Sequence, residues 1–270
     1  MGVKIMISNT LLKKEFKSNY KILLIFIAVL TMYEVIIVSM FNPELGETLD
    51  AFAKAMPEIM SAFGMANTGS TLTEFLSNYL YGFLLLVFPM ILEIILANKL
   101  VAKYVDTGSM AYLLSTPNSR KKIVITQGLF VIINIVILIL YVTILGIICS
   151  EVMFPGDLDI ERFILINMSV LSIHIAISGI CFFASCISND MKLAYSIGAG
   201  VPIAFYIIQM LVNMGGKLEK LKYFTLFTLF EPNNIATGNY NIGFLIAAFI
   251  IGIAFYILGI LLFSKRDLPL

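Results

Sequence analysis

Few side chains in this sequence could carry out chemistry at the centre of a membrane. His174 is the only histidine, and Glu34, Glu93 and His174 all lie within long apolar runs. A histidine in such a run could relay protons or contact a substrate. Because His174 has no second titratable group on its own run, the sequence favours a hydrogen-bonded packing role for it.

The two glutamates occupy different depths. Glu34 lies about 12 residues into the first run, roughly 18 Å along a helix and thus in the outer half of a membrane. An unpaired charge there costs on the order of 3 kcal/mol. Two interpretations are open: the carboxylate faces a cavity or a subunit interface, or it reaches the outer membrane surface. Glu93 lies near the inner end of the second run, within two helical turns of Lys99 and Lys103, so an ion pair at the membrane interface accounts for it.

The sequence lacks the motifs of common catalytic sites. It has no GxxxxGK[ST] loop for ATP phosphates, no HExxH and no GxSxG. We therefore expect this chain to bind no cofactor or metal and to hydrolyse no ATP by itself. One histidine and two separated glutamates also make a poor set for an intramembrane enzyme, which needs paired catalytic groups.

The composition indicates a protein that has lipid as its solvent. Hydrophobic residues make up 60% of the chain and charged residues only 13%, against roughly 25% charged in ordinary soluble domains. The net charge of +1, with basic residues scattered between apolar runs, argues against nucleic acid as a partner.

Six apolar runs approach the roughly 20 residues that a helix needs to cross a membrane. They leave room for one domain, 1–270, and predict an all-α integral membrane protein with a bundle of six transmembrane helices. Lys and Arg concentrate on one side of the spans, so both termini are expected to be cytoplasmic in a cell membrane. The expected spans are Ile22–Phe41, Phe75–Ala97, Ile123–Cys149, Phe163–Ile187, Leu193–Met214 and Ile242–Phe263.

Shorter amphipathic segments flank these spans. The N-terminal segment has the pattern of a helix in the cytoplasmic membrane interface, and of an ordinary basic flank equally. After the first span, apolar residues at helical spacing, interrupted by Pro57, predict two short outer helices. Between spans five and six, Tyr223–Phe230 predicts a short half-inserted outer element. The residues in the first two patterns are Ile5, Leu12 and Phe16 against Lys13, Lys14 and Lys17, and then Leu45, Leu49, Phe52, Met56, Ile59, Met60 and Phe63.

The segment between the second and third spans has the most informative pattern. Gly108 and Pro117 bracket a short apolar stretch, in which Met110, Leu113 and Leu114 form one face of a helix. The proline ends this helix, and the Asn-Ser pair after it offers a cap to the helix of span three. An apolar face on a cytoplasmic helix needs a partner to cover it. An ATPase subunit and the underside of the bundle itself are both candidates.

The same segment resembles a signature of type 2 ABC transporter permeases. The family's pattern after its second span, G-[TS]-[LM]-x-x-LLS-x-P-x-[ST]-R, is similar to Gly108-Ser109-Met110 followed by Leu113-Leu114-Ser115-Thr116-Pro117-Asn118-Ser119-Arg120. The basic N-terminal helix, the six spans and the basic segment 263–267 extend the resemblance over the whole chain. Family members usually carry a glutamate before the glycine, where this chain has Tyr104 and then Asp106.

This resemblance implies a function and a set of partners. The chain would be the membrane-spanning permease subunit of an ATP-driven exporter, paired with a second permease subunit, identical or related. Two cytoplasmic ATPase subunits would bind ATP and Mg²⁺ and dock on a coupling helix within 107–119. The residues implied in coupling are Asp106, Gly108, Ser109, Met110, Tyr112, Leu113, Leu114, Pro117 and Arg120.

The transported molecule would be an amphipathic peptide, drug, lipid or ion, and Glu34, His174 and Glu93 are the candidates for the transport path or the subunit interface. A membrane immunity or scaffolding protein without an ATPase partner is the alternative from another class. Such a protein would keep the topology and have no need for the short helix between spans two and three.

Overall fold

The computed structural model describes residues 7–41, 51, 54–65 and 69–267, and every regular element in these ranges is helical. Six of the described helical segments are long and apolar enough to cross a membrane, which confirms the expected six-span helical architecture. The segments are Asn9–Ser39, Leu84–Asp106, Arg120–Met153, Ile160–Ile187, Met191–Asn213 and Ile242–Lys265.

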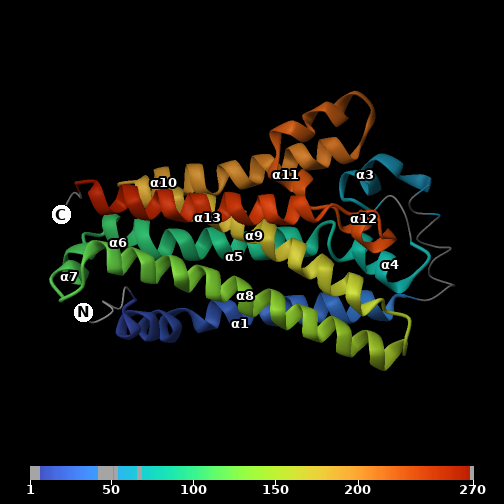
Figure 1. Ribbon diagram of the computed structural model, residues 1–270, viewed down its shortest axis with the longest axis horizontal. Helices are drawn as coiled ribbons and strands as arrows, with labels where there is room; N and C mark the ends of the chain where they lie inside the picture. Colours follow the sequence, from blue (N-terminus) through green and yellow to red (C-terminus); the bar gives the residue numbers. More distant parts are fainter. Residues whose placement is uncertain (1–6, 42–50, 52–53, 66–68, 268–270) are drawn as a thin grey trace.

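The spans lie side by side along the long axis of the molecule (Figure 1). The start of α1 (Asn9–Ser39) and the end of α13 (Ile242–Lys265) lie at one end, together with α6 (Lys103–Asp106) and α7 (Met110–Leu114). The opposite end carries three short helices. These short helices are α3 (Pro57–Ala62), α4 (Leu72–Tyr79) and α12 (Pro232–Thr237). We call the two ends the α7 end and the α12 end.

The first helix joins two elements that the sequence separates. The expected interfacial helix and first span form one continuous helix of 31 residues. At 1.5 Å per residue this helix is about 46 Å long, whereas the hydrocarbon core of a membrane is about 30 Å thick. The helix is therefore longer than a span requires, which leaves its amphipathic start outside the hydrocarbon core. Leu12 and Phe16 are half-buried while the three nearby lysines are exposed, as the pattern predicts. Ile5 lies outside the described residues.

The second span begins later than expected. Its apolar run starts with α4, breaks at 80–83, and continues as α5 (Leu84–Ala97), the π-helical segment η1 (Asn98–Ala102) and α6. The break coincides with Gly82, where a side chain would clash with the carbonyl of Phe63. The span is therefore Leu84–Asp106 rather than Phe75–Ala97. The cause is a close tertiary approach that hydropathy does not register.

The fourth span, α9 (Ile160–Ile187), is the most deeply buried of the six and satisfies backbone groups that two prolines leave open. Pro89 in α5 and Pro202 in α11 (Gly200–Asn213) have no N–H, so the carbonyls four residues earlier, Leu85 and Gly198, lose their helical donors. His174 Nε2 lies 2.7 Å from the Leu85 carbonyl, and Cys181 Sγ donates to the Gly198 carbonyl at 3.0 Å. Both contacts give these carbonyl oxygens a hydrogen-bond donor, which water does not supply inside a membrane.

The same helix also supports the π-helical segment. Ser185 Oγ donates to the Ala97 carbonyl at 2.8 Å and accepts from the Ala102 amide at 2.9 Å. The hydroxyl therefore bridges the two ends of the wide turn. Together with the two proline contacts, this makes α9 the helix that stabilises the irregular parts of its neighbours.

The last span packs against α9 through small residues. The buried residues of α13 recur every three or four positions, and a Cβ on Gly252 would lie 2.5 Å from the Ile175 carbonyl oxygen. The backbones of α9 and α13 therefore touch, as is common for membrane helices with small residues at their interface. The buried positions are Ala248, Gly252, Tyr256, Gly259 and Phe263.

The remaining elements match the sequence in part. The third span, α8 (Arg120–Met153), is capped by Ser119 Oγ, which accepts from the Lys122 amide at 3.2 Å, so the predicted cap is confirmed. Of the two expected outer helices, the second is α3, which begins at Pro57. Leu45, Leu49 and Phe52, which belong to the first, lie outside the described residues. The other elements are α10 (Met191–Gly198) and the 3₁₀ segments η2 (Gly216–Phe224) and η3 (Leu226–Leu229).

Candidate functional site

The short helix α7 lies at the tip of the α7 end, and its expected apolar face packs against the bundle. Met110 is buried at 1% exposure, and Leu113 and Leu114 are half-buried against the core. Packing under the bundle, one of the two alternatives, therefore covers much of the apolar face. Tyr112, at 80% exposure, points away from the protein. Gly108 makes the turn before α7 with a φ of +67°, a conformation that favours glycine.

The residues that flank α7 connect it to the rest of the α7 end. Arg120 Nη1 donates to the carbonyl of Arg266, and Arg266 Nη2 donates to the carbonyl of Ser188, both at 2.9 Å. These bonds join the start of α8, the end of α13 and the end of α9. Among the implied coupling residues, Met110 and Arg120 therefore contact the rest of the protein. Tyr112, Asp106 and Pro117 are exposed.

A polar cluster beneath α7 joins three spans. The Glu15 carboxylate of α1, at 2% exposure, accepts from Tyr104 Oη of α6 at 3.1 Å and from Gln127 Nε2 of α8 at 3.2 Å. Asn19 Nδ2 donates to the other oxygen at 3.1 Å, and Lys14 Nζ donates to Tyr104 Oη at 3.3 Å. Bonds to a charged acceptor are stronger than neutral ones. We call these five residues the Glu15 cluster.

Glu15 is not among the site residues predicted from the sequence, although the residues around it indicate that it is buried. Leu11, Glu15, Asn19 and Leu23 recur every four residues, and all four are buried. A carboxylate and an amide in register with two leucines on one helical face indicate a buried polar contact. The partners, which come from two other helices, could not be identified in this way.

Glu34 lies buried within the chain, near the α12 end of α1. Its side chain is fully buried, and neither carboxylate oxygen has a hydrogen-bond partner among the described residues. A Cβ on Gly146 of α8 would lie 2.6 Å from Glu34 Oε1 and from Phe163 Cζ, so the missing side chain of Gly146 makes room for the carboxyl group. The carboxyl group neither reaches the surface nor faces an open cavity of this chain.

Glu34→Met is expected to raise the free energy of unfolding by about 1–2 kcal/mol, because it replaces a buried group without donors by an apolar side chain of similar length. Thermal unfolding in detergent micelles, followed by circular dichroism, measures the change. Glu34→Gln is the matched control and should give a smaller gain, since it keeps a polar group. Destabilisation by the methionine would mean that a polar partner satisfies this carboxyl group.

Glu93 and His174 come together at the centre of the bundle, although 81 positions separate them. His174 Nδ1 lies 2.7 Å from Glu93 Oε1, and both side chains are fully buried. The contact is close but not a linear hydrogen bond, because Oε1 lies off the ring N–H direction. The Leu85 carbonyl can only accept, so Nε2 carries a hydrogen and Nδ1 is the atom that faces the carboxylate.

This contact corrects the interpretation of Glu93. The expected ion pair with Lys99 or Lys103 at the membrane interface is not formed, since the carboxylate faces α9 and is inaccessible to solvent. His174 is a hydrogen-bonded packing residue, as the sequence favours, and it also contacts a carboxyl group that lies on another helix. The pair and Glu34 stay separate, because Glu34 contacts Gly146 of α8 instead.

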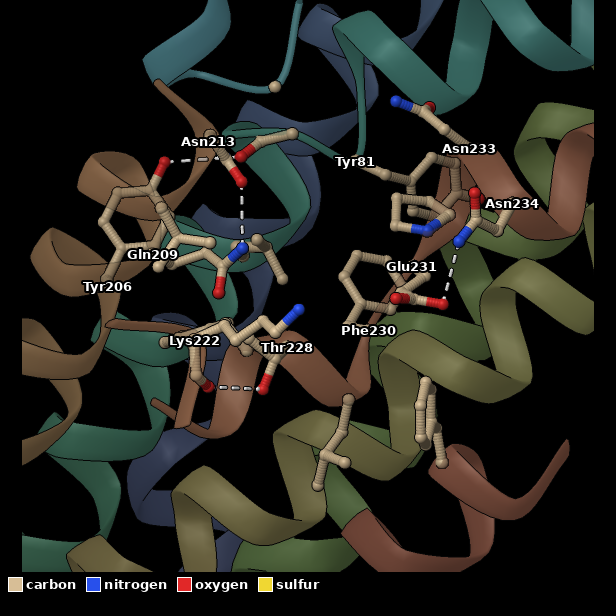
Figure 2. Close-up of a pocket in the computed structure, with 18 of the residues that line it drawn as sticks. Tyr81, Tyr206, Gln209, Asn213, Lys222, Thr228, Phe230, Glu231, Asn233 and Asn234 are labelled. Atoms are coloured by element: carbon tan, nitrogen blue, oxygen red, sulfur yellow. Dashed lines mark hydrogen bonds between the residues drawn. The ribbon is translucent and has the colours of Figure 1, made fainter. Parts of the chain in front are cut away.

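A cavity of about 570 Å³ opens at the α12 end between α5, α11, η2, η3 and α12. Figure 2 shows Gln209 and Asn213 on one side of it and Glu231, Asn233 and Asn234 on the other. The cavity could not be predicted from the sequence, because its walls come from segments that are far apart in the chain. The expected half-inserted element, Tyr223–Phe230, contributes much of its lining.

No three His, Cys, Asp or Glu side chains gather in the described parts of the chain in the arrangement that a metal site needs. Comparison with known proteins gave no match to a family model, a curated protein or a solved structure. The α7 end, the buried acidic residues and the cavity are the features of the described structure that bear on function.

Proposed function

We propose that this chain is the membrane-spanning permease subunit of an ATP-driven exporter that resembles the type 2 ABC family. In this proposal the α7 end is cytoplasmic, two ATPase subunits dock there, and a second permease subunit, identical or related, lies beside the chain in the cell membrane. The observation that carries the proposal is α7 itself, a short helix with an outward-facing tyrosine at 80% exposure.

The contacts around α7 could transmit a movement to the spans. Met110 anchors the inward face of the helix in the core. On the chain before α7, Tyr104 is bonded to the Glu15 cluster, and on the chain after it, Arg120 is bonded to the end of α13. A partner that displaces α7 would therefore pull on α1, α6, α8 and α13 together.

Tyr112→Asp is expected to weaken association with the ATPase subunit at least roughly tenfold, because a charge placed at the centre of an interface loses its hydration without a partner. The test is affinity purification of the full chain from its native membrane in mild detergent, with mass spectrometry of the co-purifying subunits and an assay of ATP hydrolysis. Tyr112 is a better probe than Leu113, which is half-buried, so that a charge there would also disturb packing.

Tyr223→Asp is the matched control, because Tyr223 is 81% exposed at the opposite end of the molecule. It should retain the ATPase subunit at the wild-type level. If the wild-type chain co-purifies with no ATPase in several detergents, the exporter proposal fails and the immunity or scaffolding alternative takes its place. If both tyrosine variants retain the subunit, docking does not use α7.

A further inference from the structure

The cavity at the α12 end has the size and shape of a small-molecule site. Its volume of about 570 Å³ falls within the roughly 300–1,000 Å³ typical of ligand sites. It is open to the surface, and its lining combines aromatic rings with side-chain amides and carboxylates. Such a mixture of apolar faces and few polar groups is what an amphipathic ligand requires.

The charges that line the cavity sum to one negative unit. Lys222 Nζ contacts Glu219 Oε1 at 3.2 Å, and this hydrogen bond and charge raise the pKa of Lys222, which stays protonated. Glu231 also lines the cavity and forms no ion pair within the described ranges, but its charge contributes to the raised pKa of Lys222. Its Oε2 accepts from the neutral amide of Asn234 at 2.9 Å. Two carboxylates therefore share one lysine, and the lining keeps a net charge of one negative unit.

The amide side chains on the opposite wall are held in place by hydrogen bonds. Gln209 Nε2 donates to Asn213 Oδ1 at 2.9 Å, and Asn213 Nδ2 donates to the carbonyl of Ala62 at 3.2 Å. This chain of bonds fixes the orientation of Gln209. Its Oε1 atom is buried and has no donor in the described part of the protein. Protein atoms cover this oxygen, so the amides shape this wall of the cavity and Gln209 Oε1 is not a contact for a ligand.

Aromatic side chains form the apolar part of the lining. Tyr206 packs edge-on against Phe227 with ring centroids 5.6 Å apart, and Tyr81 lies 6.4 Å from Phe230. Tyr81, Tyr206 and Phe230 lie around the space between Gln209 and Glu231 (Figure 2). The faces of aromatic rings attract cations as well as apolar groups. The rings and the net negative charge of the lining thus favour the same kind of ligand.

We propose that the cavity at the α12 end binds an amphipathic organic cation. The cationic group lies at the Glu231 carboxylate, and the apolar body lies against the rings of Tyr206 and Phe230. This assigns a ligand site that is separate from α7 and needs no ATPase partner for binding.

The test is equilibrium binding of rhodamine 6G, a fluorescent amphipathic cation, to the purified full chain in an uncharged detergent, measured by fluorescence polarisation. The wild-type protein should bind it saturably. Glu231→Gln should weaken binding on the order of tenfold, the equivalent of one charge-assisted contact.

Glu161→Gln is the matched control, because Glu161 is an exposed carboxylate in the first turn of α9 and lies outside the cavity. It should bind the dye like the wild type. The proposal is overturned if binding is unsaturable, if Glu231→Gln binds as tightly as the control, or if the anionic dye anilinonaphthalene sulfonate binds better than the cation. These results are independent of whether an ATPase co-purifies, so this inference and the exporter proposal can fail separately.

Discussion

His174→Leu is expected to lower the free energy of unfolding by about 3 kcal/mol, because it leaves two buried polar groups without their partner. The imidazole lies 2.7 Å from Glu93 Oε1 and 2.7 Å from the Leu85 carbonyl oxygen. Leucine fills a similar volume but leaves the buried Glu93 carboxyl group without its imidazole contact and the Leu85 carbonyl without its donor, at a depth where water cannot replace them. Thermal unfolding in detergent micelles, followed by circular dichroism, measures the loss.

The double variant Glu93→Leu with His174→Leu is the control for this interpretation. It removes the unpaired carboxylate and should recover part of the stability, because apolar pairs can replace buried ion pairs at little cost. The unsatisfied Leu85 carbonyl should keep it below the wild type. If the double variant loses as much as the two single variants combined, Glu93 and His174 act independently, and the pair does not join α5 to α9.

Gly252→Ala is expected to cost about 2 kcal/mol. The added Cβ would lie 2.5 Å from the Ile175 oxygen, 2.6 Å from the Ile175 carbonyl carbon and 2.8 Å from the Ala176 nitrogen. All three atoms belong to the backbone of α9, so no side chain can move aside and the helices must separate. Overpacking of this kind costs about 1–3 kcal/mol, and it outweighs the gain of up to about 1 kcal/mol from alanine's higher helix propensity.

Gly200→Ala provides the matched control for the same unfolding measurement. Gly200 begins α11, and no described atom lies within 4 Å of the position that its Cβ would take. The substitution should be neutral or stabilise the protein by about 0.5 kcal/mol, through the unfolded state. Equal stability of the two variants would show that α9 and α13 can separate without cost, which would contradict the close backbone contact.

The second span connects the features on which these proposals depend. Gly82 and Leu86, at its start, line the α12-end cavity. Glu93, near its middle, contacts His174, and Tyr104, at its end, belongs to the Glu15 cluster just before α7. One continuous span therefore runs from the proposed ligand site to the proposed docking helix. The His174 variant should for this reason disturb both ends.

The sequence by itself was sufficient for the features that depend on local composition and local backbone chemistry. Apolar runs of membrane length predict the six spans, because a helix must satisfy its backbone bonds internally in lipid. Ser119 as a cap and the amphipathic start of α1 follow from one segment at a time. The prolines likewise show where helical bonds are lost. The exporter function follows from a resemblance that one short motif carries and the arrangement of the spans extends, and it is a proposal.

Only the tertiary structure decided which side chains meet. In a membrane helix the lipid-facing and protein-facing residues are both apolar, so hydropathy does not reveal which face is buried or which helix lies next to it. The sequence therefore could not show that His174 meets Glu93, that Glu15 meets Tyr104, or that Met110 turns inward and Tyr112 outward. The α12-end cavity depends on the same long-range packing, because its walls come from four separate parts of the chain.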